Sequence, residues 1–184
     1  MCLENGVTIV CADEGVLGGI KNIYLVGKDS VTSFTAGALH DYTAVAMSST
    51  GAAYQFHKFE FLDETGALTW ENTVNDNRTK PFATTVAATI PNMDRTKALQ
   101  LQNLVNCCGV IAIVELYNDK AFVVGYDEKV GNKGTNGSVG GEAGPTLDDN
   151  NAYLLSLTGK QGEIPRQFVG TITITGGSTV TFAA

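Results

Sequence analysis

The most regular pattern in the chain is an alternation of apolar and polar side chains with a period of two residues. In residues 82–90, Val86 and Ala88 fall on one face. Thr85 and Thr89 fall on the other. This alternation, rich in β-branched residues, is typical of a half-buried strand. Similar patterns predict further strands over residues 20–26, 30–35, 53–63, 67–74, 110–116, 120–126, 152–158, 168–175 and 179–183.

Residues 53–63 and 67–74 form the best hairpin prediction. They flank Asp63-Glu64-Thr65-Gly66, a turn signal with its glycine placed late. The apolar phase changes between Phe56 and Phe59, so apolar groups are expected on both sides of the sheet. One side would be core and the other a contact with another subunit. The aromatic candidates for that contact are Tyr54, Phe56, Phe59, Phe61 and Trp70.

A helical period is convincing over one segment, about 93–108, where either Asn92 or Asp94 can cap the first turn. Apolar side chains recur there at helical spacing and predict one amphipathic helix packed on a sheet. The residues of that face are Ala98, Leu101, Val105 and Cys108, with Leu104 beside them.

Residues 127–150 are rich in glycine, lysine and asparagine and poor in apolar side chains. They predict a loop longer than about 15 residues, a length that often indicates function or disorder. The loop is either mobile or ordered on a neighbouring subunit. Lys133 and Asn136 are its candidate contact residues.

These elements predict a single domain over residues 1–184. Sequential hairpins favour a mainly β fold, an antiparallel sandwich or barrel with one flanking helix. The chain carries a formal net charge of −7 and has no basic cluster, so no surface for gripping nucleic acid is predicted. Charged residues make up only 17% of the chain, which fits a surface partly covered by neighbouring subunits.

Candidate chemistry is sparse. His40 and His57 lie in no nucleophile motif. The cysteines lack zinc-ligand spacing and are expected to be reduced thiols; they are Cys2, Cys11, Cys107 and Cys108. The glycine-rich segment is not a phosphate-binding loop, and residues 148–151 lack the spacing of a calcium loop. We therefore predict no catalytic residue, no metal, no cofactor and no enzymatic activity. No signal peptide and no membrane-spanning segment are predicted.

Three segments resemble a known family. They are VCADEGVLGGIKNIYLV at 10–26, KAFVVGYDEK at 120–129 and DDNNAYLLSLTGKQGEIPRQF at 148–168. They resemble tail-associated structural proteins of phages and prophages of Bacteroidetes, in particular phage tail tube proteins. The resemblance implies hexameric rings that stack into a tube, with other tail proteins as further partners. It also implies passing phage DNA that is not specifically bound, assembly in the host bacterial cytoplasm, and a final location in the virion tail.

Other functions remain open at the level of sequence. The chain could be another virion component, such as a tail terminator, a head–tail connector or a capsid decoration protein. It could also be a β-sandwich module that binds carbohydrate or a host surface, in which Trp70 and the tyrosines form a stacking platform.

Overall fold

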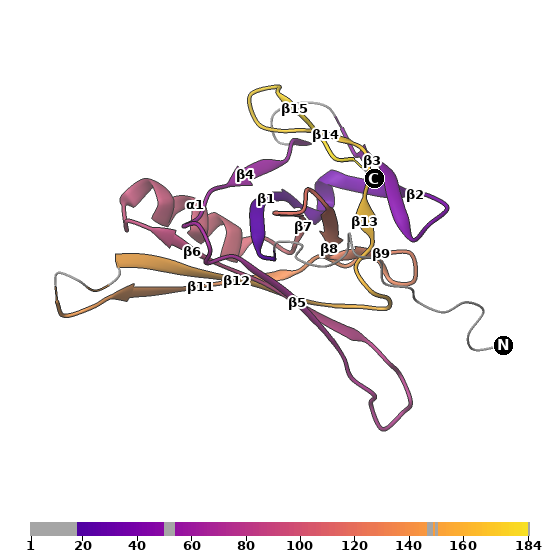
Figure 1. The fold of residues 1–184 in the computed structure, drawn as a ribbon, viewed down its shortest axis with the longest axis horizontal. Coiled ribbons are helices and arrows are strands. Elements are labelled where there is room, and N and C mark those ends of the chain that lie inside the picture. Colours follow the sequence, from indigo (N-terminus) through magenta and orange to yellow (C-terminus); the bar gives the residue numbers. More distant parts are fainter. Residues whose placement is uncertain (1–17, 50–53, 147–148, 150, 184) are drawn as a thin grey trace.

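The computed structural model describes residues 18–49, 54–146, 149 and 151–183, and this part of the chain is mainly β, with 53% strand and one α-helix (Figure 1). The predicted fold class is confirmed, as packed sheets without a closed barrel. The larger sheet has seven strands, in the order β2 (Val31–Ala36), β3 (Asp41–Met47), β13 (Gln167–Phe168), β8 (Ala121–Val124), β7 (Val110–Leu116), β1 (Ile20–Gly27) and β4 (His57–Phe59). Its neighbouring strands are antiparallel except β13 and β3, which are parallel.

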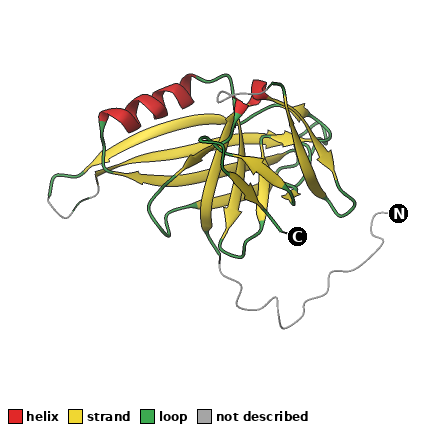
Figure 2. Cartoon of the chain, turned by 90° about the horizontal axis from the view of Figure 1, so that it is seen from above, coloured by secondary structure: helices red, strands yellow, loops and turns green. Residues whose placement is uncertain are grey.

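A four-stranded antiparallel sheet packs on one face of the larger sheet (Figures 1 and 2). Its order is β11 (Asn136–Ala143), β12 (Asn151–Gln161), β6 (Phe82–Pro91) and β5 (Ala67–Asn72). Two small ribbons complete the described fold: β9 (Tyr126–Asp127) with β10 (Gly131–Asn132), and β14 (Thr171–Thr173) with β15 (Thr179–Thr181). A single 3-10 turn, η2 (Lys28–Ser30), joins β1 to β2.

The central strands β1 and β7 are buried on both faces, which explains why both are nearly continuous runs of apolar residues. One core fills the space between the two sheets and the helix, around Leu25, Val86 and Leu157. A second core lies on the opposite face of the larger sheet, around Phe56, Tyr42 and Phe168. The fold is therefore layered, with the larger sheet in the middle.

The predicted helix is confirmed as α1 (Arg95–Asn106). Asp94 is the N-cap, and its carboxylate accepts hydrogen bonds from the backbone amides of Thr96 and Lys97. Leu101 and Leu104 are the buried residues of its inner face. Of the other predicted face positions, Val105 and Cys108 are exposed.

The predicted hairpin over 53–74 is wrong. Among residues 54–63, the described part of its first half, only His57–Phe59 forms a strand, β4, and it pairs with β1 of the larger sheet. The second half forms β5, which pairs with β6 of the other sheet. The chain crosses between the sheets at Gly66, where an added Cβ would lie 2.7 Å from the Phe61 ring and 2.9 Å from Ile20. The late glycine permits this close crossing and does not fold the chain back on itself.

The predicted long loop at 127–150, of which residues 147, 148 and 150 lie outside the described residues, is also wrong where it forms β10 and β11. Residues 136–143 form β11, which pairs with β12 from Asn136↔Thr158 to Ala143↔Asn151. Glycine and asparagine have low β propensity, so a segment rich in them does not look like a strand in the sequence. This segment is a strand because it pairs with β12. Where α1 crosses β11, an added Cβ at Gly137 would lie 3.4 Å from Leu104. The small residues of this segment thus let the helix pack against it.

Candidate functional site

The four-stranded sheet has a strand at each side with an unpaired outer edge. β5 pairs only with β6, and β11 pairs only with β12. Within the described residues, no backbone hydrogen bond joins the outer edge of either strand to another segment. An open edge exposes backbone N–H and C=O groups that can pair with another chain. Because the two open edges belong to one sheet, a second copy could continue that sheet on either side.

The outer face of this sheet is built almost entirely from small neutral side chains. The register places Ala83, Thr85, Ala87 and Thr89 of β6 on it, with Thr69, Leu154, Ser156, Thr158, Ser138 and Gly140 from the neighbouring strands. Its charged members in these strands are Glu71, Glu142 and Lys160. None of the predicted contact residues marks this face as a candidate site, although the Thr/Ala alternation of residues 83–89 is a signal for it.

The aromatic candidates from residues 53–63 lie inside the subunit. Phe56 is 1% exposed in the second core and forms an isolated bridge with Ile174, so its prediction as a subunit contact is wrong. Phe59 and Phe61 pack against the core between the sheets. Tyr54 is half-buried. Phe56 and Phe59 do point to opposite faces of the larger sheet, as predicted. Each face is covered by a core of the same subunit.

Two of the remaining candidates lie on the open-edged strands. Trp70, on β5, is 43% exposed and its ring lies 6.2 Å from that of Phe122, on the inner side of the sheet. Asn136 is exposed at the first position of β11. Lys133 is exposed just before it. The structure therefore does not gather the predicted residues at one point, and separates Trp70 from Asn136 by the width of the sheet.

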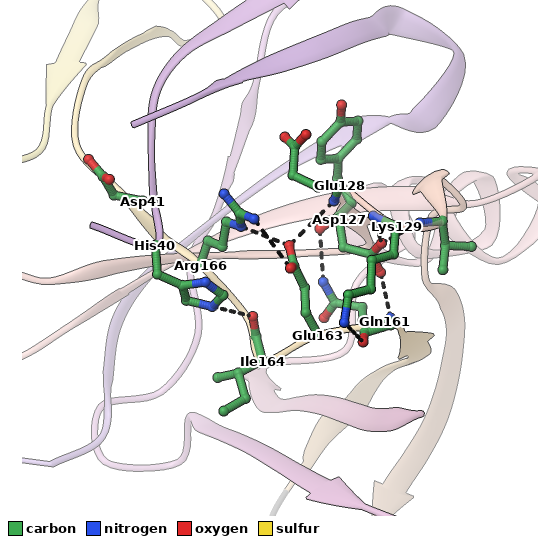
Figure 3. A network of polar contacts seen from close by, with 12 residues as sticks. His40, Asp41, Asp127, Glu128, Lys129, Gln161, Glu163, Ile164 and Arg166 are labelled. Carbon is green, nitrogen blue, oxygen red and sulfur yellow. Dashed lines mark hydrogen bonds and ion pairs between the residues drawn. The ribbon is translucent and has the colours of Figure 1, made fainter. Parts of the chain in front are cut away.

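A polar network joins three connections at one end of the fold (Figure 3). The guanidinium of Arg166 donates to both carboxylate oxygens of Glu163, at 2.7 and 3.2 Å, and lies over the ring of Tyr42. Asp127, which is buried, accepts from backbone amides only. Burial raises the pKa of the Tyr42 hydroxyl far above its usual value. The carboxylates and the guanidinium are thus held by partners within the subunit, whereas the buried Tyr42 hydroxyl has no hydrogen-bond partner in the described residues. The ion pair and the bonds of Asp127 fit a structural role.

Another buried acid, Glu115, is partnered in the same way. Lys21 lies 3.2 Å from its carboxylate, and the side chains of Asn22 and Tyr24 donate to it. Burial, and then the nearby Glu115 charge, raises the pKa of Tyr24 to about 12. Glu115 is thus held by three side chains of β1, without facing an apolar cleft as a catalytic acid would.

Each histidine ring lies within hydrogen-bond distance of a neutral oxygen atom. Nδ1 of His57 lies 2.7 Å from the hydroxyl of Thr175, and Nε2 of His40 lies 3.1 Å from the carbonyl oxygen of Ile164. Among the described residues, no group of three or more His, Cys, Asp or Glu side chains is placed to hold a metal ion. Cys107 and Cys108 are free and exposed. The described part of the chain also has no helix with the length and apolarity needed to cross a membrane.

Comparison with known proteins adds no relative. No family model matches the chain, and neither a curated protein nor a solved structure matches it significantly.

Proposed function

We propose that this protein is a virion structural subunit that assembles with copies of itself into rings, and that stacked rings form a phage tail tube. The observation that carries the proposal is the four-stranded sheet with open edges on both β5 and β11. Pairing of β5 in one copy with β11 in the next would be a head-to-tail contact. Such a contact closes into a ring when the rotation between copies fits, and it removes every open edge of that sheet.

The distribution of mass around the sheet supports one orientation in such a ring. The seven-stranded sheet, the helix and both cores lie on the inner side of the four-stranded sheet (Figure 1). A ring has more room on its outside than on its inside. The bulk of each subunit would therefore face outward, and the outer face of the four-stranded sheet would line the lumen.

The small neutral side chains of that face suit a passage for DNA. Specific and non-specific DNA binding both depend on Lys and Arg contacts to phosphates. In the strands of this face, Lys160 is the one basic residue, against Glu71 and Glu142. Such a wall offers DNA little to bind and would let it slide.

The test is the assembly state of purified full-length protein, measured by light scattering after gel filtration and by negative-stain electron microscopy. We expect rings or tubes. A double variant, Thr69→Glu with Ser138→Glu, puts like charges on both edges of the sheet, and like charges across strands are destabilising. It should shift the protein towards monomers, and replacing the second change by Ser138→Lys should restore assembly.

The matched control is Thr158→Glu, which adds the same charge to the same face on the central strand β12. It should leave ring formation intact. A protein that stays monomeric at high concentration, or an edge variant that assembles like the parent, contradicts the proposal. Rings that never stack would indicate a terminator or connector in place of a tube.

A further inference from the structure

An open apolar groove of about 650 Å³ lies between α1 and β4. Its apolar lining comes from the helix, from the end of β1 and from β4, including Leu25, Phe59, Leu101 and Leu104. The thiol-bearing residue Cys107, at the end of α1, also lines it. Grooves of this size and polarity commonly bind apolar groups. No described side chain from elsewhere in the subunit fills it.

Three exposed apolar side chains border the polar network, each at a different point along it. Leu39 is 89% exposed, Val130 is 51% exposed and Ile164 is 45% exposed. The Ile164 backbone is in contact with His40, next to Leu39, as Figure 3 shows. Val130 lies against Gly162, where an added Cβ would be 3.3 Å from it. We call Leu39, Val130 and Ile164 the apolar tip.

A single exposed leucine is ordinary, but this one is held in a fixed position. The backbone amide of Leu39 donates to the Asp41 side chain at 2.9 Å, and the amide of Gly37 donates to the Asp41 carbonyl at 2.9 Å. His40 has a φ of 61°, in the left-handed region that costs about 1–2 kcal/mol for a residue with a side chain. The turn between β2 and β3 thus presents Leu39 to solvent on a backbone that other contacts hold in place.

We propose that the apolar tip of one copy inserts Leu39 into the α1–β4 groove of the next copy along the tube. The inference rests on the proposed self-assembly and names a contact distinct from edge pairing. In Figure 1, α1 lies towards one end of the long axis, and the β2–β3 turn lies at the other. An apolar knob and an apolar groove at opposite ends of one molecule make a head-to-tail contact that repeats without closing.

The charges around the two surfaces support the same pairing. Lys58 and Lys97 line the groove, each also near one carboxylate, Glu60 and Asp94 respectively. The apolar tip is bordered by Asp41 and Glu128, which have no ion-pair partner within the described residues, and by one lysine beside Val130, Lys129, whose ammonium donates to the Gly162 carbonyl. Complementary charge steers association and fixes its register. A second copy therefore fits the groove in apolarity, and the small acidic excess of its tip suits a groove lined by two lysines and one glutamate.

Disulfide trapping tests the contact, because a disulfide forms only when the two Cα atoms come within about 7 Å. One chain carries Leu39→Cys with all four native cysteines changed to serine. The other retains only Cys107. The two chains are mixed, assembled and then oxidised with copper phenanthroline. Because each chain carries a single cysteine, a disulfide can form only between subunits. We expect a disulfide-linked dimer on a non-reducing gel, with the Cys107 peptide identified by mass spectrometry.

The matched control places the new cysteine at Val74, which is also strongly exposed but lies in the β5–β6 connection. The Val74→Cys chain should give several-fold less product. A second variant, Leu39→Ser, should leave rings intact but prevent their end-to-end growth. Since Leu39 is almost fully exposed, this change should not affect folding.

The outcomes separate the two proposals. Rings that form and stack without the trapped product overturn this contact and leave the proposed function standing. Monomers in every condition overturn both. Trapping of Cys11 by Cys107 within one native chain would assign the groove to residues 1–17 and overturn its assignment to a second copy.

Discussion

The carboxylate of Asp127, on β9, accepts a hydrogen bond of 2.7 Å from the backbone amide of Gly162, 35 residues further along the chain. Its other oxygen accepts from the amides of Lys129 and Val130 within its own turn (Figure 3). The neighbouring Gln161 side chain donates to the Tyr126 carbonyl at 2.9 Å. One buried acid therefore ties the β9–β10 turn to the segment that follows β12.

Replacing this acid should destabilise the fold markedly. Asp127→Ala leaves three backbone amides without their acceptor in a site where the side chain is 2% exposed. Each buried donor left unsatisfied costs about 1–3 kcal/mol. Because Lys129 and Val130 are exposed and their amides can turn to water, we expect less than three full penalties, a loss of about 2–4 kcal/mol in the free energy of unfolding. Urea denaturation followed by circular dichroism measures it. The adjacent exposed change Glu128→Ala should stay within about 0.5 kcal/mol of the parent, and equal losses in the two variants would contradict this role.

The ion pair of Glu163 and Arg166 should make stability depend on acid pH. Burial tends to raise the pKa of Glu163, but the hydrogen bonds from Arg166 and from the Glu128 amide outweigh it, and the pKa falls below its ordinary 4.5. A carboxyl group with a lowered folded-state pKa stabilises the fold above its unfolded pKa. That stability is lost as the pH falls through the lowered folded value. The parent should therefore lose this contribution below about pH 4.5.

Glu163→Gln isolates that contribution, because it keeps the shape of the side chain and removes its charge. The difference in unfolding free energy between parent and variant should be largest near neutral pH and should shrink as the solution is acidified below about pH 4.5. Guanidinium or urea titrations at several pH values give the comparison. A difference that stays constant down to strongly acidic pH would show that the charge of Glu163 contributes nothing.

The strands that were predicted correctly are those whose pattern is local. β6 alternates so cleanly that its buried face, Val86, Ala88 and Ile90, follows directly from the period of two. β7 reads as an apolar run because both of its faces are covered. The helix was found because its period and its cap at Asp94 lie in one stretch of sequence. In these segments local propensity and tertiary environment agree.

The errors fall where a distant partner decides. β11 has four residues of high turn or loop preference, Asn136, Gly137, Gly140 and Gly141, and becomes a strand by pairing with β12. β4 and β5 were joined into one hairpin because their turn signal is strong, yet their partners lie in different sheets. The open edges of the four-stranded sheet depend on that distribution of partners. For this reason the candidate site could not be predicted, although the strands that form it largely could.

The exposed turn before β5 offers a gain in stability. Glu64 has a φ of 62°, a left-handed conformation that costs about 1–2 kcal/mol for a residue with a side chain. Glycine adopts this left-handed conformation without strain, but its greater freedom in the unfolded chain lowers the free energy of unfolding by about 0.4–1 kcal/mol. Glu64→Gly should therefore raise the unfolding free energy by up to about 1 kcal/mol. Asp63→Gly, at a neighbouring turn position without positive φ, should lower it, and thermal denaturation of the two variants should show opposite shifts.

The orientation of the four-stranded sheet in an assembled particle can be tested by labelling. Thr158 is exposed on its outer face, whereas Ser178 is exposed in the β14–β15 hairpin, beyond the opposite face of the larger sheet (Figure 1). In a chain with the native cysteines changed to serine, Thr158→Cys and Ser178→Cys should react equally with a small maleimide when the protein is disassembled. In assembled tubes, we expect a large polymer-linked maleimide to label the Ser178→Cys variant and to leave the Thr158→Cys variant largely unreacted, because a lumen admits the small reagent and hinders the large one. Rapid polymer labelling of both variants would place the sheet face on the outside of the particle and contradict the proposed orientation of the subunit in the ring.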